Sequence, residues 1–175
     1  TRDDVKTISK YPHAGFCKFH FDTEKPPWND VRLRQALSLT INREADISTF
    51  FGSETKYIGM ISDGFVDALG PKDLGEGSKY LVRDLAAAEQ LVKDAGYPVP
   101  FEFNYLHDLL FDSRVARFTN DMLEGPFKPK VKAMTVQEYL TSAYIGKWPA
   151  GYGVTFGCGP VNIDAGAFLG SLFHP

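Results

Sequence analysis

Apolar residues recur at helical spacing directly after the proline pair at positions 26–27. Asn29 and Asp30 can each cap a helix start, because their side-chain oxygens accept hydrogen bonds from free amides. The apolar stripe that follows has the spacing i, i+3, i+4, i+7 and i+8, at Leu33, Ala36, Leu37, Thr40 and Ile41. This pattern predicts a helix with one buried face. Asn42 offers a second cap, and a shorter helix is expected to run to Gly52.

Four later segments also have helical spacing. The first spans 84–95, with Asp84 as its cap and Gly96 at its end. The second starts at about Ser113, with Val115, Phe118, Met122 and Leu123 on its apolar face. The third starts at a capping box, in which Thr135 and Glu138 satisfy each other's amides. Its inward positions are Val136, Tyr139, Leu140, Ala143 and Tyr144. The last helix starts at about Asp164.

Three segments, 16–22, 101–105 and 128–135, separate apolar from polar or charged residues on opposite faces, as half-buried strands do. A fourth strand is expected at 152–156, buried because of its apolar content. Residues 1–15 read as an irregular lead-in, and 52–79 as a long surface loop. Strands that alternate with helices predict an α/β fold, with a mixed β-sheet covered by helices on both faces.

Composition narrows the class of protein. A chain of 175 residues with a net charge of −3 fits about one domain and gives no electrostatic case for nucleic acid. No apolar run approaches the ~20 residues that a membrane span requires. The absence of an initiating Met and of a signal peptide suggests a processed or excised piece. Cys17 and Cys158 leave two alternatives, a disulfide in an exported protein or small buried thiols in a reducing compartment.

Residues that could carry catalysis or bind a metal do not form a known motif. Gly157-Cys158-Gly159 resembles a nucleophile elbow, but Val161 stands where the last glycine of that frame belongs. His20 and His107 have no partners at metal-ligand spacing. We therefore expect no enzyme, no cofactor and no metal. A small cysteine-dependent α/β hydrolase is the less favoured alternative.

Two ordered motifs resemble one family. Residues 26–44 read PPWNDVRLRQALSLTINRE, and an Asp-led Ala/Leu helix closes in Ala95-Gly96-Tyr97. Both are similar to hallmarks of family 5 extracellular solute-binding proteins, which capture peptides, nickel or other solutes for ABC importers. The resemblance implies that residues 16–175 form the C-terminal-half lobe of a two-lobed, type II periplasmic-binding fold, with the chain crossing between lobes at 16–22.

The resemblance also implies a location and partners. It suggests a periplasmic or extracellular protein, associated with the membrane through its transporter or a lipid anchor. Its partners would be a small-molecule or peptide solute and an ABC permease, and we expect a monomer that binds no nucleic acid. Because half of the cleft would be missing, this chain alone should bind solute weakly or not at all. A sensor or chaperone module that reuses the lobe is the alternative.

The expected binding residues follow two strands. Ligands of open α/β sheets lie beyond the carboxyl ends of strands, so we expect a glycine-rich bend at 157–164 to line the cleft. The predicted ligand-binding residues are Tyr105, His107, Phe156, Gly157, Cys158, Gly159, Val161 and Asp164. Alternatively, Asp164 is only the cap of the last helix.

One departure from the family motif bears on the solute. Peptide-binding relatives have Gly-Trp-x-x-Asp at this bend, and that Asp neutralises the peptide α-amine. Here Cys158 aligns with the Trp, and Val161 aligns with the Asp. An ammonium group buried beside valine would remain unpaired. An uncharged solute, such as an oligosaccharide or a modified amide, fits better than an oligopeptide held by its N-terminus.

Overall fold

The chain folds around one four-stranded mixed sheet. The computed structural model describes residues 15–51, 70–108, 112–143 and 147–160. Its strands are β1 (Gly15–Phe21), β2 (Phe101–Asp108), β3 (Phe127–Met134) and β4 (Val154–Pro160), in the spatial order β1-β4-β2-β3. β2 runs parallel to both β3 and β4, whereas β1 runs antiparallel to β4. The predicted mixed sheet is confirmed.

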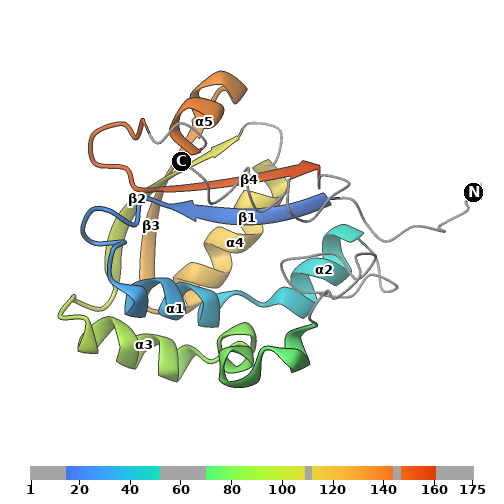
Figure 1. Ribbon diagram of the computed structural model, residues 1–175, viewed down its shortest axis with the longest axis vertical. Helices are drawn as coiled ribbons and strands as arrows, with labels where there is room; N and C mark the ends of the chain where they lie inside the picture. The colour runs from blue at the N-terminus through green and yellow to red at the C-terminus, as the bar shows by residue number, and fades with distance from the viewer. Residues whose placement is uncertain (1–14, 52–69, 109–111, 144–146, 161–175) are drawn as a thin grey trace, which may run out of the picture.

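Helices cover both faces of this sheet. On one side lie α1 (Val31–Thr40), α3 (Leu85–Asp94) and α4 (Asp112–Glu124), and α5 (Val136–Ala143) lies on the other (Figure 1). The helix α2 (Arg43–Phe51) follows α1 after a two-residue break. The short 3-10 helices η1 (Pro71–Asp73) and η2 (Gly75–Leu81) lie largely within the expected loop at 52–79.

Helix starts behave as the sequence predicts. The Asp30 carboxylate accepts a hydrogen bond from the Arg32 amide at 2.9 Å, and the Asp84 carboxylate accepts one from the Ala87 amide at 2.9 Å. In the capping box, the Thr135 amide donates to Glu138 Oε2 at 2.7 Å, and the Glu138 amide donates to Thr135 Oγ1 at 3.2 Å. These bonds satisfy amides that have no partner inside their own helices.

The predicted buried faces are correct for α1 and too wide for α4 and α5. All five stripe residues of the first helix are at most 6% exposed. In contrast, Leu123, Val136 and Leu140 are 54%, 46% and 42% exposed, although we expected them to face inward. α4 and α5 pack on the sheet through narrower stripes, so apolar residues at the margins of those stripes remain in solvent.

Aromatic side chains from separate segments build the core between the sheet and α4. Phe19 packs its ring 5.1 Å from that of Phe156, to which it lies opposite across β1 and β4. Trp28, in the loop before α1, is 2% exposed, and its ring centroid lies 5.0 Å from that of Phe103. Because Trp28 contacts both β1 and β2, it fixes the loop before α1 onto the sheet.

Candidate functional site

The carboxyl ends of the three parallel strands meet at one edge of the sheet. β2 ends at Asp108, opposite Met134 at the end of β3. β4 ends at Pro160, opposite Gly15 at the start of the antiparallel β1. In open α/β sheets this is the edge where ligands bind. We refer to it as the carboxyl edge, defined by Gly15, Asp108, Met134 and Pro160.

Two of the predicted site residues are core residues. Tyr105 is 0% exposed, and its hydroxyl lies 2.7 Å from Thr119 Oγ1 on α4. Burial raises the pKa of Tyr105 to about 12. Phe156 is 1% exposed, with its ring centroid 4.8 Å from that of Phe118. Both side chains face α4 and are used for packing, so we correct their expected place at an open surface.

The first half of the segment expected to be a bend, residues 157–160, is the last part of a strand. Residues 157–160 complete β4 and pair with residues 15–18 of β1, because the backbone ladder to β1 continues through both glycines. Gly157, Cys158 and Gly159 therefore lie along the sheet as it approaches the carboxyl edge. Val161 and Asp164 fall outside the described residues.

His107, like Gly159 in β4, lies one residue from the carboxyl end of its strand. It is the penultimate residue of β2 and lies between Phe156 of β4 and Ala133 of β3. Its side chain is 6% exposed. His107 is thus a buried polar residue of β2 beside β4, and its contact with a solute stays a prediction.

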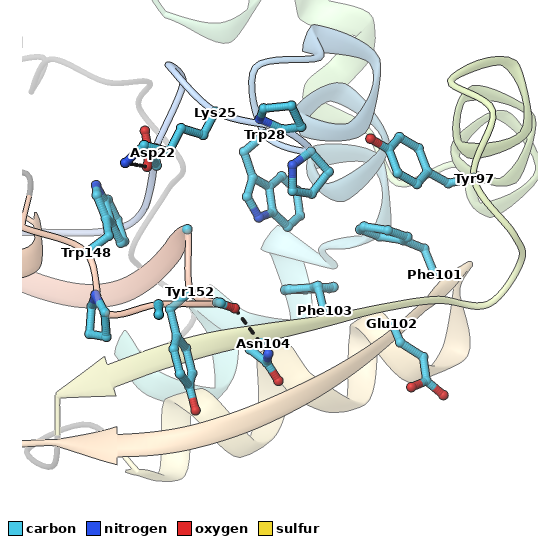
Figure 2. A pocket seen from close by; sticks show the side chains of 16 residues that line it. Asp22, Lys25, Trp28, Tyr97, Phe101, Glu102, Phe103, Asn104, Trp148 and Tyr152 are labelled. Atoms are coloured by element: carbon cyan, nitrogen blue, oxygen red, sulfur yellow. Dashed lines mark hydrogen bonds and ion pairs between the residues drawn. The ribbon is translucent and has the colours of Figure 1, made fainter.

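A hollow that the sequence did not predict lies at the opposite edge. It has a volume of about 550 Å³ and is surrounded by aromatic side chains from three separate segments, among them Trp28, Phe103 and Tyr152 (Figure 2). Asn104 Nδ2 donates to the Gly151 carbonyl at 3.1 Å within it. Its signal in the sequence was the cluster Trp148-Pro-Ala-Gly-Tyr152, which carries two aromatic residues in a turn.

Several of the aromatic side chains that line this hollow are packed against other core residues. Phe101 and Phe103 are each 7% exposed, and the ring of Trp28 packs against that of Phe21 at 5.1 Å. These side chains complete the core and present little surface to a solute. The hollow also lies at the amino ends of β2 and β4, away from the edge that α/β sheets use for binding.

The arginines of the signature stretch at 26–44 hold helices together and lie away from the carboxyl edge. Arg32 binds the Asp30 carboxylate through Nη2 at 2.6 Å and the Asp94 carbonyl at the end of α3 through Nη1 at 2.6 Å. Arg43 donates to Ser38 Oγ at 2.6 Å and to the Leu81 carbonyl at 3.2 Å. These arginines join α1 to α3 and η2. The motif therefore stabilises the packing of these helices and carries no information about which solute is bound.

A half-buried polar contact lies between β1 and α5. His20 Nε2 lies 3.3 Å from the Tyr139 hydroxyl, and the two rings meet edge to face. Burial, together with the nearby positive charge of Lys18, lowers the pKa of His20 to about 3. Burial also lowers the pKa of Lys18 to about 8. The imidazole is therefore neutral in the folded protein at neutral pH.

A second buried charged group joins α2 to α4. Arg117 Nε donates to Asp46 Oδ1 at 2.8 Å, and Arg117 Nη2 lies 3.5 Å from Asp121 Oδ1. Asp121 Oδ2 accepts a hydrogen bond from the Asn42 amide at 2.8 Å. Burial and the neighbouring Asp121 raise the pKa of Asp46 to about 6, although Arg117 opposes this rise. One guanidinium thus serves two buried carboxyl groups.

The described residues contain no cluster of three or more His, Cys, Asp or Glu side chains that could hold a metal ion. Within the same residues, no helix has the length and apolar character needed to span a membrane.

Comparison with known proteins decides the family. A family model described as bacterial extracellular solute-binding proteins, family 5 middle, matches residues 1–175. The chain belongs to family 5 of the bacterial extracellular solute-binding proteins. A curated relative, the probable deoxycholate-binding periplasmic protein YgiS of Escherichia coli K12, is 34% identical over 91 residues. Those residues make up 50% of this chain and 17% of that protein.

Solved structures show the same fold. MoaA of A. tumefaciens R10, in complex with mannopinic acid, matches with a TM-score of 0.72 and 20% identity over 92% of this chain and 33% of its own. DppA of Helicobacter pylori, in complex with the peptide STSA, matches with a TM-score of 0.69 and 18% identity over 91% and 30%. CtaP of Listeria monocytogenes matches with a TM-score of 0.69 and 19% identity over 91% of this chain and 32% of its own. This family 5 chain thus has a type II periplasmic-binding fold and spans about a third of the length of these structures.

Proposed function

We propose that this chain is one lobe of a protein that captures a small solute and delivers it to an ABC permease in the membrane. The observation that carries the proposal is the family match over residues 1–175. The fold supports it, because three parallel strands bring their carboxyl ends to one edge, as binding sheets of this class do. The solute would contact that edge and a second lobe that closes over it.

The solute class follows from the residues expected after β4. Val161 stands where peptide-binding relatives are expected to have the Asp that neutralises an α-amine. A buried ammonium group without a counter-charge is strongly disfavoured. We therefore propose a solute without a free α-ammonium group at this place, such as an oligosaccharide or an amide with a blocked amino group.

A thermal-shift screen of the full-length protein tests solute capture. The compounds are oligosaccharides, N-acetylated and free peptides, deoxycholate and mannopinic acid, the last two because relatives are named for binding them. A ligand at 100 times its Kd stabilises the protein by about 2.7 kcal/mol, so the melting temperature of a chain about three times this length should rise by roughly 2–3 °C. A screen in which no compound raises the melting temperature would contradict the proposal.

Two variants of β2 then locate the site. His107→Gln, near the carboxyl edge, should weaken binding of the compound found by about tenfold, because a buried polar contact contributes about 1–2 kcal/mol. Asn104→Ala, in the hollow at the opposite edge, is the matched control and should leave the affinity unchanged. The reverse result would move the site to that hollow.

A charge introduced at Val161 tests the proposed solute class separately. In the full-length protein, Val161→Asp should raise the affinity for tetra-alanine by roughly 10–100-fold, because a charge-assisted hydrogen bond contributes about 1.5–3 kcal/mol. N-acetyl tetra-alanine should gain nothing, and the uncharged variant Val161→Asn should behave as the wild type. Isothermal titration calorimetry measures all of these affinities.

One result would overturn the solute class and leave solute capture intact. If the unaltered protein binds tetra-alanine more tightly than its N-acetylated form, another group must neutralise the amine.

A further inference from the structure

The two cysteines lie directly opposite each other in the sheet. β1 and β4 form an antiparallel ladder of seven residue pairs, and one of these pairs joins Cys17 to Cys158. The two residues are far apart in the chain, so their spacing in the sequence carried no information about this pairing. The fold thus pairs the two cysteines of this sequence.

The hydrogen bonds of the ladder show which kind of pair this is. The Asp22 amide donates to the Gly153 carbonyl at 2.9 Å, one step beyond the pair Phe21–Val154. Opposed residues in an antiparallel ladder alternate between hydrogen-bonded and non-hydrogen-bonded pairs. Counting back from the hydrogen-bonded pair at Asp22, the pair Cys17–Cys158 falls at a non-hydrogen-bonded position.

Non-hydrogen-bonded positions suit a covalent link. Their Cα atoms lie about 4.5 Å apart, closer than the ~5.5 Å of hydrogen-bonded pairs. A disulfide requires Cα atoms roughly 4.4–6.8 Å apart, with side chains leaving on the same face. Residues directly opposite in register lie on the same face of a sheet, so this register is compatible with both requirements.

We propose that Cys17 and Cys158 form a disulfide that links β1 to β4. Its formation removes two protons and two electrons from the two thiols. A thiol–disulfide oxidoreductase, or oxidised glutathione, accepts them and is reduced to its own thiols. The family is extracellular, and disulfides persist outside the reducing cytosol. The proposal does not depend on which solute the protein binds.

The position of the proposed disulfide indicates how it would stabilise the sheet. β1 lies at the edge of the described sheet and has β4 as its neighbour there. Near the carboxyl edge this ladder contains Gly15, Gly157 and Gly159, and glycine in a strand contributes no side-chain packing and costs entropy. A covalent link between these strand ends would hold the end of β4 in register at the edge where we propose that solute binds.

Mass spectrometry of the full-length exported protein tests the bond directly. After thiols are blocked with N-ethylmaleimide in denaturant, without reductant, a tryptic digest should contain the peptide with Cys17 joined to the peptide with Cys158. Reduction with dithiothreitol should separate them and add two hydrogens in total. If both cysteines carry maleimide before reduction, or if either is joined to another cysteine of the longer protein, the proposal is wrong.

Stability measurements provide a second readout. Reduction of the full-length protein should lower its melting temperature by roughly 2–5 °C, as expected for a disulfide that closes a long loop. Cys17→Ser and Cys158→Ser should each cause the same loss, and the double variant should lose no more than either single variant. Losses that add in the double variant would show that the cysteines act separately and would contradict the bond.

Discussion

Replacing Trp28 with alanine is expected to lower the free energy of unfolding by about 3–5 kcal/mol, the usual cost of truncating a large buried aromatic side chain. Trp28 is 2% exposed. Its ring packs against Phe21, Phe101 and Phe103 at centroid distances of 5.1, 6.1 and 5.0 Å. The substitution would remove contacts to both β1 and β2. Urea denaturation followed by circular dichroism measures the loss.

The chain offers a matched control for this variant. Trp148, the second tryptophan, lines the same hollow but is only half-buried, so Trp148→Ala should cost less than about 1 kcal/mol. Gly153→Ala approaches the same contact from the other side. A Cβ atom there would lie 2.9 Å from Trp28 Cδ1, and this overpacking should cost about 1–3 kcal/mol. Equal losses for the two tryptophan variants would contradict a special role for Trp28.

Local patterns predicted the helices well because each depends on neighbours in the sequence. The stripe from Leu33 to Ile41, the caps at Asp30 and Asp84 and the capping box at Thr135 are all confirmed. The burial of Trp28 was not predicted. Its partners come from β1 and β2, and no pattern within 26–44 states which strands will cover that loop.

The candidate site was harder to predict for the same reason. Glycines and a proline at 157–160 indicated a bend, because these residues weaken strands. In the fold, this segment instead finds a partner in residues 15–18, and tertiary pairing overrides the local preference. Tyr105 and Phe156 were placed correctly along their strands. α4 covers one face of each strand, and local patterns in the sequence do not show which face that is.

Substituting His20 should change how stability depends on pH. The pKa of His20 is lowered from 6.5 to about 3 in the folded protein, first by burial and then by the charge of Lys18. Between these values the unfolded chain binds the additional proton, so His20 makes the protein less stable as the pH falls. From pH 7 to pH 5 this loss should be about 1–2 kcal/mol, at 1.36 kcal/mol per pKa unit. His20→Gln, which cannot become charged, should abolish it.

Asp46 acts in the opposite direction over the same range and provides the contrast. Its pKa is raised from 3.8 to about 6, chiefly by burial, so the folded state binds the additional proton and gains stability as the pH falls. The Asp46→Asn variant should therefore lose about 1–2 kcal/mol more than the wild type between pH 7 and pH 5.

The two effects should nearly cancel in the unaltered protein, leaving its stability almost flat over this interval. Carboxylates with lowered pKa values, such as Glu102 at about 2, respond only at more acidic pH. Urea denaturation at pH 7 and pH 5 should show the two variants diverging by about 2–4 kcal/mol in opposite directions. If stability depended on pH in the same way in both variants, the pKa shifts inferred for His20 and Asp46 would be wrong.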